Sequence, residues 1–225
     1  MGTLIYILFI SIFFPLLLMM LLVEEKARLP IAFMMVGIFI SVLASEVNGV
    51  LLTAFNLSRY DATIVLAPIS GELLKALPVL FFALVISDRK EKLFTASMAT
   101  GIGFAILENA YYLIINHQTF SFMSALIRGF GTGLMHGMCT LLVGFGISFI
   151  RKKRKLFAVG TFALLTIAIT YHSIFNMLVQ SQYSMVGAFL PLVTYMPFLL
   201  WRYFKKKIKM KNAAVYFNHC VKFSF

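Results

Sequence analysis

The chain has 225 residues, of which 61% are hydrophobic and only 12% are charged, and its formal net charge is +12. A soluble globular domain carries a smaller apolar fraction and about twice the share of charged residues. The composition therefore excludes an ordinary soluble protein and indicates an integral membrane protein.

Seven apolar segments are each about as long as a membrane-spanning helix, which needs roughly 20 residues. In chain order they are Leu4–Val23, Pro30–Phe55, Thr63–Ile86, Leu93–Ile115, Phe122–Ile150, Leu156–Val179 and Met185–Tyr203. Short loops separate them, and the first lacks the basic start and the cleavage pattern of a signal peptide. We therefore predict an all-α fold, a polytopic bundle of about seven transmembrane helices, with one integral membrane domain over residues 1–211.

Basic residues gather in alternate loops, which is typical of the cytoplasmic side of membrane proteins. They follow the first, third, fifth and seventh segments, as Lys26 and Arg28, Arg89 to Lys92, Arg151–Lys155, and Arg202–Lys211. This pattern predicts an outside N-terminus and an inside C-terminus in a multi-pass protein of the cell membrane, with residues 212–225 as a cytoplasmic tail. The basic tail is expected to meet anionic lipid headgroups. No nucleic-acid partner is expected, because no nucleic-acid-binding motif accompanies these charges.

Ionisable side chains interrupt the apolar segments at several places. A charged residue at the centre of a bilayer costs roughly 2.5–3.5 kcal/mol, so each one is a candidate functional residue, and the alternative is a structural ion pair between helices. In chain order they are Glu46, Glu72, Lys75, Glu108, Arg128, His136 and His172. Arg128 is expected nearer the surface, where its side chain reaches the headgroups.

Two carboxylates and two imidazoles fall at similar depths on four consecutive segments. At 1.5 Å per residue, Glu72, Glu108 and His172 lie roughly 12–17 Å below the outer ends of their helices, with His136 somewhat deeper. We therefore predict that they meet in one layer of the membrane. A buried carboxylate can act as a general acid or base, and an imidazole can orient a water or stabilise an oxyanion. Histidines and glutamates can equally hold a divalent metal, so the grouping suits hydrolysis.

The local spacing of these residues favours one shared site. Glu72 and Lys75 are three residues apart and share one helix face, where they can pair with each other. His172 and Asn176 are four residues apart, so both project toward one partner. A stripe of small residues beside His136 predicts that a neighbouring helix approaches closely there. Its members are Gly129, Gly133 and Gly137.

Four short motifs resemble those of PrsW-type intramembrane proteases, which carry E-E-x-x-K, then F-x-x-x-E-N, then two later membrane histidines. The matching stretches are "GELLK" (Gly71–Lys75), "FAILEN" (Phe104–Asn109), "GLMHG" around His136, and "HSIFN" (His172–Asn176). They stand in the same order within about Ile64–Val179, a motif-bearing core over residues 63–180. Two positions depart from the family pattern, because Gly71 replaces the first glutamate and Asn176 stands where many PrsW proteins carry aspartate.

The resemblance implies a protease that hydrolyses peptide bonds of a membrane-anchored protein, such as an anti-sigma factor, within or near the bilayer. Glu72 would activate a water, Glu108 would share its proton, and the two histidines would orient the water or stabilise the oxyanion. The implied catalytic residues, which are also the candidate ligands of a divalent metal such as zinc, are Glu72, Glu108, His136 and His172. The implied supporting residues are Lys75, Asn109 and Asn176. The sequence lacks the HExxH pattern that would indicate zinc, so a metal-dependent and a metal-free glutamate mechanism both stay open.

Two other classes of function remain as alternatives. The same superfamily includes CAAX-prenyl endopeptidases and bacteriocin-immunity relatives, and Gly71 replaces an acid, so a non-proteolytic protein that binds a membrane partner is the main one. Chains of glutamate and histidine also relay protons in transporters. That class is disfavoured because no inverted repeat is visible in the sequence.

Overall fold

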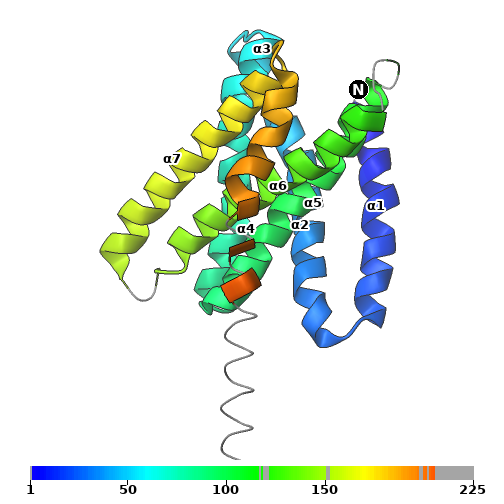
Figure 1. The fold of residues 1–225 in the computed structure, drawn as a ribbon. Coiled ribbons are helices and arrows are strands. Elements are labelled where there is room, and N and C mark those ends of the chain that lie inside the picture. The colour runs from blue at the N-terminus through cyan, green and yellow to red at the C-terminus, as the bar shows by residue number, and fades with distance from the viewer. Residues whose placement is uncertain are drawn as a thin grey trace, which may run out of the picture.

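The computed structural model describes residues 2–116, 118, 122–150, 153–197, 200, 201 and 203–205, and it shows a bundle of long helices (Figure 1). The elements are α1 (Gly2–Leu22), α2 (Glu25–Ala54), α3 (Arg59–Asp61), the π-helix η1 (Ala62–Leu66), α4 (Ala67–Val85), α5 (Lys90–Ile115), α6 (Phe122–Ile147), α7 (Arg154–Val179) and a shorter helix, Ser184–Pro197. The described residues contain no strand.

The all-α membrane bundle predicted from the sequence is confirmed. Within the described part of the chain, six helices are long and apolar enough to cross a membrane, with α3, η1 and α4 together forming the third. The Ser184–Pro197 helix stands in the place of the seventh predicted span, and residues 198, 199 and 202 of that span lie outside the described part of the chain. The predicted tail, residues 212–225, also lies outside it. The orientation of the termini stays a prediction.

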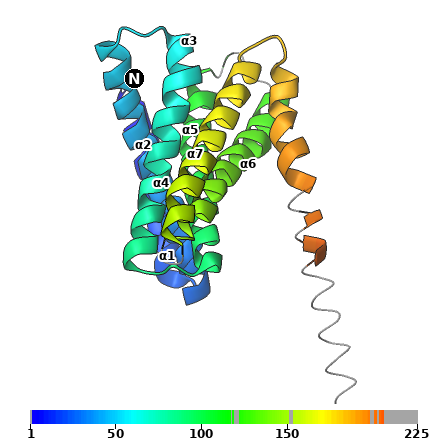
Figure 2. The same cartoon turned by 90° about the vertical axis from the view of Figure 1, so that its left-hand side faces the viewer.

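Helices α2, α5 and α6 form the centre of the bundle, and the remaining helices pack around them. Helix α1 lies at one side against α2 and α5, while α7 lies at the other and leans away from the bundle at one end (Figure 1). Helix α6 runs obliquely across the others, with the Ser184–Pro197 helix beside it (Figure 2). Because α4 and α6 contact each other and both α5 and α7, polar residues on these four helices can converge.

Glycines set the closest helix contacts, but not at all the positions predicted. A Cβ atom at Gly37 of α2 would overlap the carbonyl oxygen of Thr100 on α5, and one at Gly101 of α5 would overlap the carbonyl oxygen of His136 on α6. The prediction of a close contact along the Gly129–Gly133 part of the stripe is wrong for the described residues, since none of their atoms lies within 4 Å of a Cβ at either position. Helix α6 is rotated so that Gly137, beside His136, faces α5 instead.

The α2–α5 contact predicts a clear difference between two glycine substitutions on one helix. Gly37→Ala forces α2 away from α5, and such overpacking costs about 1–3 kcal/mol. Gly49→Ala is the matched control, because nothing lies within 4 Å of its Cβ position and replacing a helical glycine by alanine is neutral to mildly stabilising. We expect unfolding in detergent to show a lower midpoint for Gly37→Ala and no loss for Gly49→Ala. Equal midpoints would contradict this account of the contact.

Candidate active site

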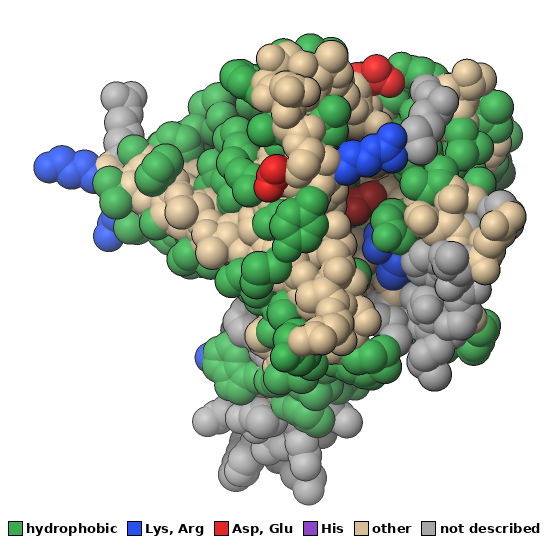
Figure 3. Space-filling model, turned by 90° about the horizontal axis from the view of Figure 1, so that it is seen from above, with side chains coloured by type: hydrophobic (Ala, Val, Ile, Leu, Met, Phe, Trp, Pro, Cys, Tyr) green, Lys and Arg blue, Asp and Glu red, His purple; other side chains and the backbone are tan. Residues whose placement is uncertain are grey.

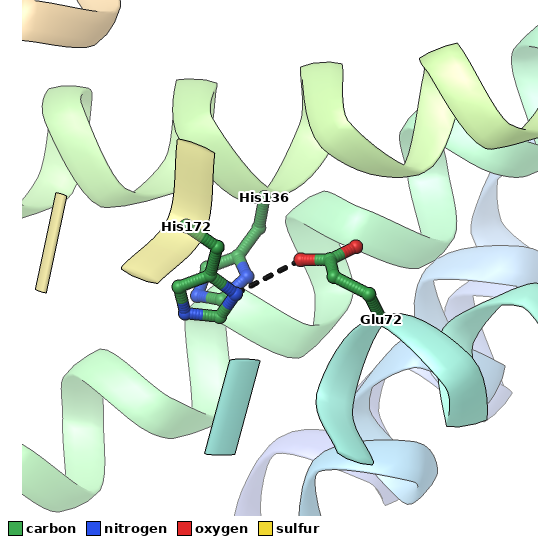
Figure 4. A group of neighbouring side chains, drawn as sticks. All are labelled: Glu72, His136 and His172. Carbon is green, nitrogen blue, oxygen red and sulfur yellow. Dashed lines mark hydrogen bonds and ion pairs between the residues drawn. The ribbon is translucent and has the colours of Figure 1, made fainter. Parts of the chain in front are cut away.

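Helix α4 carries two charged residues that face the interior of the bundle. The side chains of Glu72 and Lys75, three residues apart, are fully buried, and Lys75 Nζ donates to Glu72 Oε1 at 2.7 Å. The same oxygen accepts a hydrogen bond from His172 Nδ1 of α7 at 2.9 Å. Figure 4 shows the Glu72 carboxylate facing the two imidazoles, with its second oxygen turned away from His172. Glu72 thus has one oxygen held by two donors.

His136 of α6 lies between the two carboxylates. Its Nδ1 is 3.0 Å from Lys75 Nζ, and its Nε2 is 2.8 Å from Glu108 Oε2 of α5. An ammonium can only donate, so Nδ1 accepts and the ring proton sits on Nε2, the nitrogen beside Glu108. The rings of His136 and His172 meet edge to face with centroids 4.7 Å apart. Phe104 packs on His136 with centroids 4.9 Å apart, which fixes the imidazole from the other side.

The predicted convergence of two acids and two histidines is therefore confirmed as geometry. Helices α4 to α7 supply one member each. Lys75 joins the same cluster and neutralises part of its negative charge. In a membrane interior, a carboxylate held by an ammonium and an imidazole avoids most of the cost of an isolated charge.

Several buried polar atoms of this region have no hydrogen-bond partner among the described residues. They are Glu72 Oε2, Asn109 Oδ1, Arg128 Nε, Thr132 Oγ1 and His136 Nε2, the last of which lies 2.8 Å from Glu108 Oε2 without hydrogen-bond geometry. Buried polar atoms in folded proteins are nearly always paired, with protein or with ordered water. Their concentration around one cluster indicates a place that accommodates water or a polar part of a substrate.

Three of the four predicted metal ligands form a compact donor set. Single ligand atoms of Glu72, His136 and His172 all lie within 4.8 Å of one another, whereas Glu108 is not a member of this group. Two imidazoles and one carboxylate are a ligand set of catalytic zinc sites, and Glu72 Oε2 is a buried oxygen with no partner. The residues therefore fit a divalent metal. For His136 to serve as a ligand, Lys75 or Glu108 has to release one of its ring nitrogens.

The site opens toward the end of the bundle that carries α3. The side chain of Glu108 is 34% exposed, while Glu72 and His136 are fully buried. Figure 3 looks onto this end and shows an acidic side chain set back in a hollow with basic side chains beside it. By its partial exposure and its short distance to the buried His136, Glu108 connects the cluster with the surface.

The sequence suggested that the Arg128 side chain reaches away from the bundle to the lipid headgroups. In the structure it instead lies against α5. Its side chain is only 12% exposed, and Nη2 lies 3.9 Å from Glu108 Oε1. Its guanidinium carbon lies 3.9 Å from the centroid of the Tyr112 ring. The reason is that α6 turns this face toward α5. The signal that would have placed it inward is its spacing of eight residues from His136, which puts both on one face of α6.

The two predicted supporting amides bind backbone carbonyls. Asn109 Nδ2 donates to the carbonyl oxygen of Arg128 at 3.3 Å and links α5 to α6. Asn176 Nδ2 donates to the carbonyl oxygen of Thr63, in η1, at 2.9 Å. His172 and Asn176 therefore face the same continuous helix, as their spacing predicted, but the amide of Asn176 bonds the π-helical turn. Glu46 lies outside this cluster and accepts a hydrogen bond from Tyr6 of α1 at 2.9 Å.

The bond from Asn176 predicts that aspartate is not equivalent at this position. Asn176→Asp removes the donor and places a carboxylate beside the Thr63 carbonyl, at a cost of about 1–2 kcal/mol. Gln182→Glu, an amide-to-acid change at an exposed residue in the turn after α7, is the control. Unfolding midpoints in detergent should fall for Asn176→Asp and stay near wild type for Gln182→Glu. An unchanged midpoint for Asn176→Asp would show that the Thr63 bond adds no stability.

Comparison with known proteins gives one informative match. Neither a curated protein nor a solved structure matches the chain. The family model described as PrsW family intramembrane metalloprotease matches residues 25–202. This range runs from the start of α2 past the Ser184–Pro197 helix and includes every residue of the cluster. The match confirms the resemblance seen in the four motifs, and the chain belongs to the PrsW family of intramembrane metalloproteases.

Proposed function

We propose that the chain cleaves a peptide bond of a membrane-anchored protein, and that Glu72 activates the attacking water. The observation that carries this proposal is the asymmetry of the Glu72 carboxylate. Oε1 is held by Lys75 and His172, while the buried Oε2 has no hydrogen-bond partner among the described residues. A carboxylate oxygen that is fixed in place and left free to accept is suited to take a proton from water.

The remaining residues of the cluster have distinct tasks in the proposed reaction. Glu72 Oε2 takes a proton as the water oxygen attacks the peptide carbonyl carbon. The negative charge that develops on the carbonyl oxygen is stabilised by the Lys75 ammonium, which has a third N–H beyond those directed to Glu72 and His136, in surroundings that exclude bulk water. The proton held at Glu72 then passes to the leaving amine as the carbon–nitrogen bond breaks. Glu108, hydrogen-bond distance from His136 Nε2, orients that imidazole.

The family description raises the question of a metal, and the donor set is compatible with one. Glu72, His136 and His172 are the residues that would hold it. A bound divalent cation supplies Lewis acidity toward the carbonyl and makes a water more acidic. Elemental analysis of the purified protein before and after a chelator, with cleavage measured on each sample, separates the two mechanisms. Cleavage lost on chelation and restored by zinc shows a metal-dependent reaction, whereas full activity without metal assigns the chemistry to the side chains alone.

The substrate proposal rests on the family. Membership supports a protein substrate in a membrane, and the resemblance to PrsW proteins favours an anti-sigma-factor-like regulator with one membrane span, cleaved in the cell membrane. Gly71 favours the alternative of a binding protein without protease activity, because it replaces the first acid of the family motif. A Cβ atom at Gly71 would lie 3.7 Å from Phe104 Cζ, so this position faces the Phe104 ring.

The direct test is cleavage of a single-span substrate by the purified protein in detergent or liposomes. His172→Ala removes a donor to Glu72 Oε1 and one of the two imidazoles, so we expect a loss of cleavage of about a hundred-fold or more. Thr166→Ala, an exposed position on the same helix that bonds only its own turn, is the matched control and should cleave normally. Equal rates for the two variants would overturn the proposed site. A wild type that binds the substrate without cutting it would support the binding protein.

A further inference from the structure

Arg128 makes contacts with three residues of one face of α5, and none of the motifs includes it. Its Nη2 lies 3.9 Å from Glu108 Oε1, and its guanidinium carbon lies 3.9 Å from the centre of the Tyr112 ring. Its own carbonyl oxygen accepts a hydrogen bond from Asn109 at 3.3 Å. Arg128 is therefore joined to α5 by an ion pair, by stacking on a ring and by a backbone hydrogen bond. Two of its partners, Glu108 and Asn109, belong to the FAILEN motif.

Among the four acids and histidines of the cluster, Glu108 has the most exposed side chain, so its orientation depends most on a neighbouring residue. Its side chain is 34% exposed, so water competes for it, whereas His136 is fully buried. One carboxylate oxygen, Oε2, is directed to His136 Nε2, and the other, Oε1, faces the arginine. The two oxygens are therefore divided between the imidazole on the inner side and the guanidinium on the outer side. Without the guanidinium, the carboxylate is free to turn toward the opening.

We propose that Arg128 is a positioning residue that holds the Glu108 carboxylate against His136. The inference rests on the proposed function, in which Glu108 orients that imidazole. Arg128 acts from outside the buried cluster and through Glu108. The stacking on Tyr112 limits the guanidinium to one orientation, since arginine favours the face of an aromatic ring. Lysine offers the charge without the planar group, so it should replace Arg128 in part.

The test is a double-mutant cycle on cleavage of a single-span substrate. Arg128→Ala should lower kcat about ten-fold with little change in KM, because it loosens the carboxylate that orients His136 and does not remove a contact with the substrate. Glu108→Gln should lower kcat at least as much, and the double variant should be no slower than Glu108→Gln alone. Arg128→Lys should recover part of the loss. Arg59→Ala, an exposed arginine near the same end of the bundle, is the control and should match wild type.

Three outcomes would overturn the positioning role. A higher KM with unchanged kcat for Arg128→Ala would make Arg128 a substrate-binding residue. Losses of kcat that multiply in the double variant would show that Arg128 acts independently of Glu108. Wild-type kinetics for Arg128→Ala would show that Arg128 has no role in the reaction. A second readout keeps the proposal separate from the protease function. The fall in melting temperature caused by Arg128→Ala should be smaller in the Glu108→Gln background than in wild type. If wild type cleaves nothing, the proposed function fails, and this thermal coupling still decides whether Arg128 holds Glu108.

Discussion

Glu72→Gln should lower the rate of substrate cleavage about a thousand-fold, which is the typical size of a lost general base. Glutamine keeps the shape of the side chain and can still accept from Lys75 and His172 through its amide oxygen. The atom in the place of Oε2 becomes an NH₂ group, which donates and cannot take a proton from water. The measurement is single-turnover cleavage of a single-span substrate by purified variants, with substrate binding measured in parallel. Binding should be retained while cleavage is lost.

Folding has to be separated from chemistry in this experiment. Glu72→Gln leaves the buried Lys75 ammonium without its carboxylate, and Lys75 is 0% exposed, so the single variant is expected to be less stable. Glu72→Gln combined with Lys75→Met removes both charges and leaves similar volumes, which is often neutral for a buried pair. This double variant should fold like wild type and remain inactive. Cleavage by a well-folded double variant would place the base elsewhere and refute the assignment to Glu72.

The fold and the depth of the site follow from properties that the sequence carries directly. Each apolar run is long enough to cross a bilayer, and the rise of a helix per residue converts a position into a depth. This is why Glu72, Glu108 and His172 could be assigned to one layer before any contact was known. The four motifs then indicated which helices must face one another, and the structure has these residues in contact.

The parts that the sequence did not predict depend on helix rotation and on backbone irregularity. Arg128 was expected at the headgroups because a hydropathy pattern gives its depth but not its direction, and packing of α6 on α5 turns it inward. The glycine contacts depend on the same rotation, so the contact of α6 falls at Gly137 and not at Gly129. The partner of Asn176 is a backbone carbonyl in a π-helical turn, and such single turns have no strong side-chain signature although they are common at functional sites.

Lys75→Met should reduce the free energy of unfolding by about 3 kcal/mol, near the lower end of the 3–5 kcal/mol range for breaking a buried ion pair. Both side chains of the pair are fully buried, so the loss leaves the Glu72 carboxylate without its ammonium and shielded from bulk solvent. The expected cost is at the lower end because His172 still donates to Glu72 Oε1. The measurement is the unfolding midpoint and slope in mixed detergent micelles. Lys90→Met, at the exposed start of α5 where the ammonium lies 4.6 Å from the Phe149 ring, is the control and should cost less than about 1 kcal/mol.

The cycle formed by Lys75→Met, Glu72→Gln and the double variant assigns this energy to the pair. If the charges stabilise each other, the double variant recovers most of the stability lost in each single variant, because no unpaired charge is left. Additive losses would mean that each residue contributes through packing alone, and Lys75 would then not act as the counter-ion of the proposed base. Lys75 also donates to His136 Nδ1, so its loss frees that nitrogen to change tautomer. Cleavage by Lys75→Met should therefore fall even at temperatures where the variant remains folded, since both the base and the imidazole beside Glu108 lose the group that orients them.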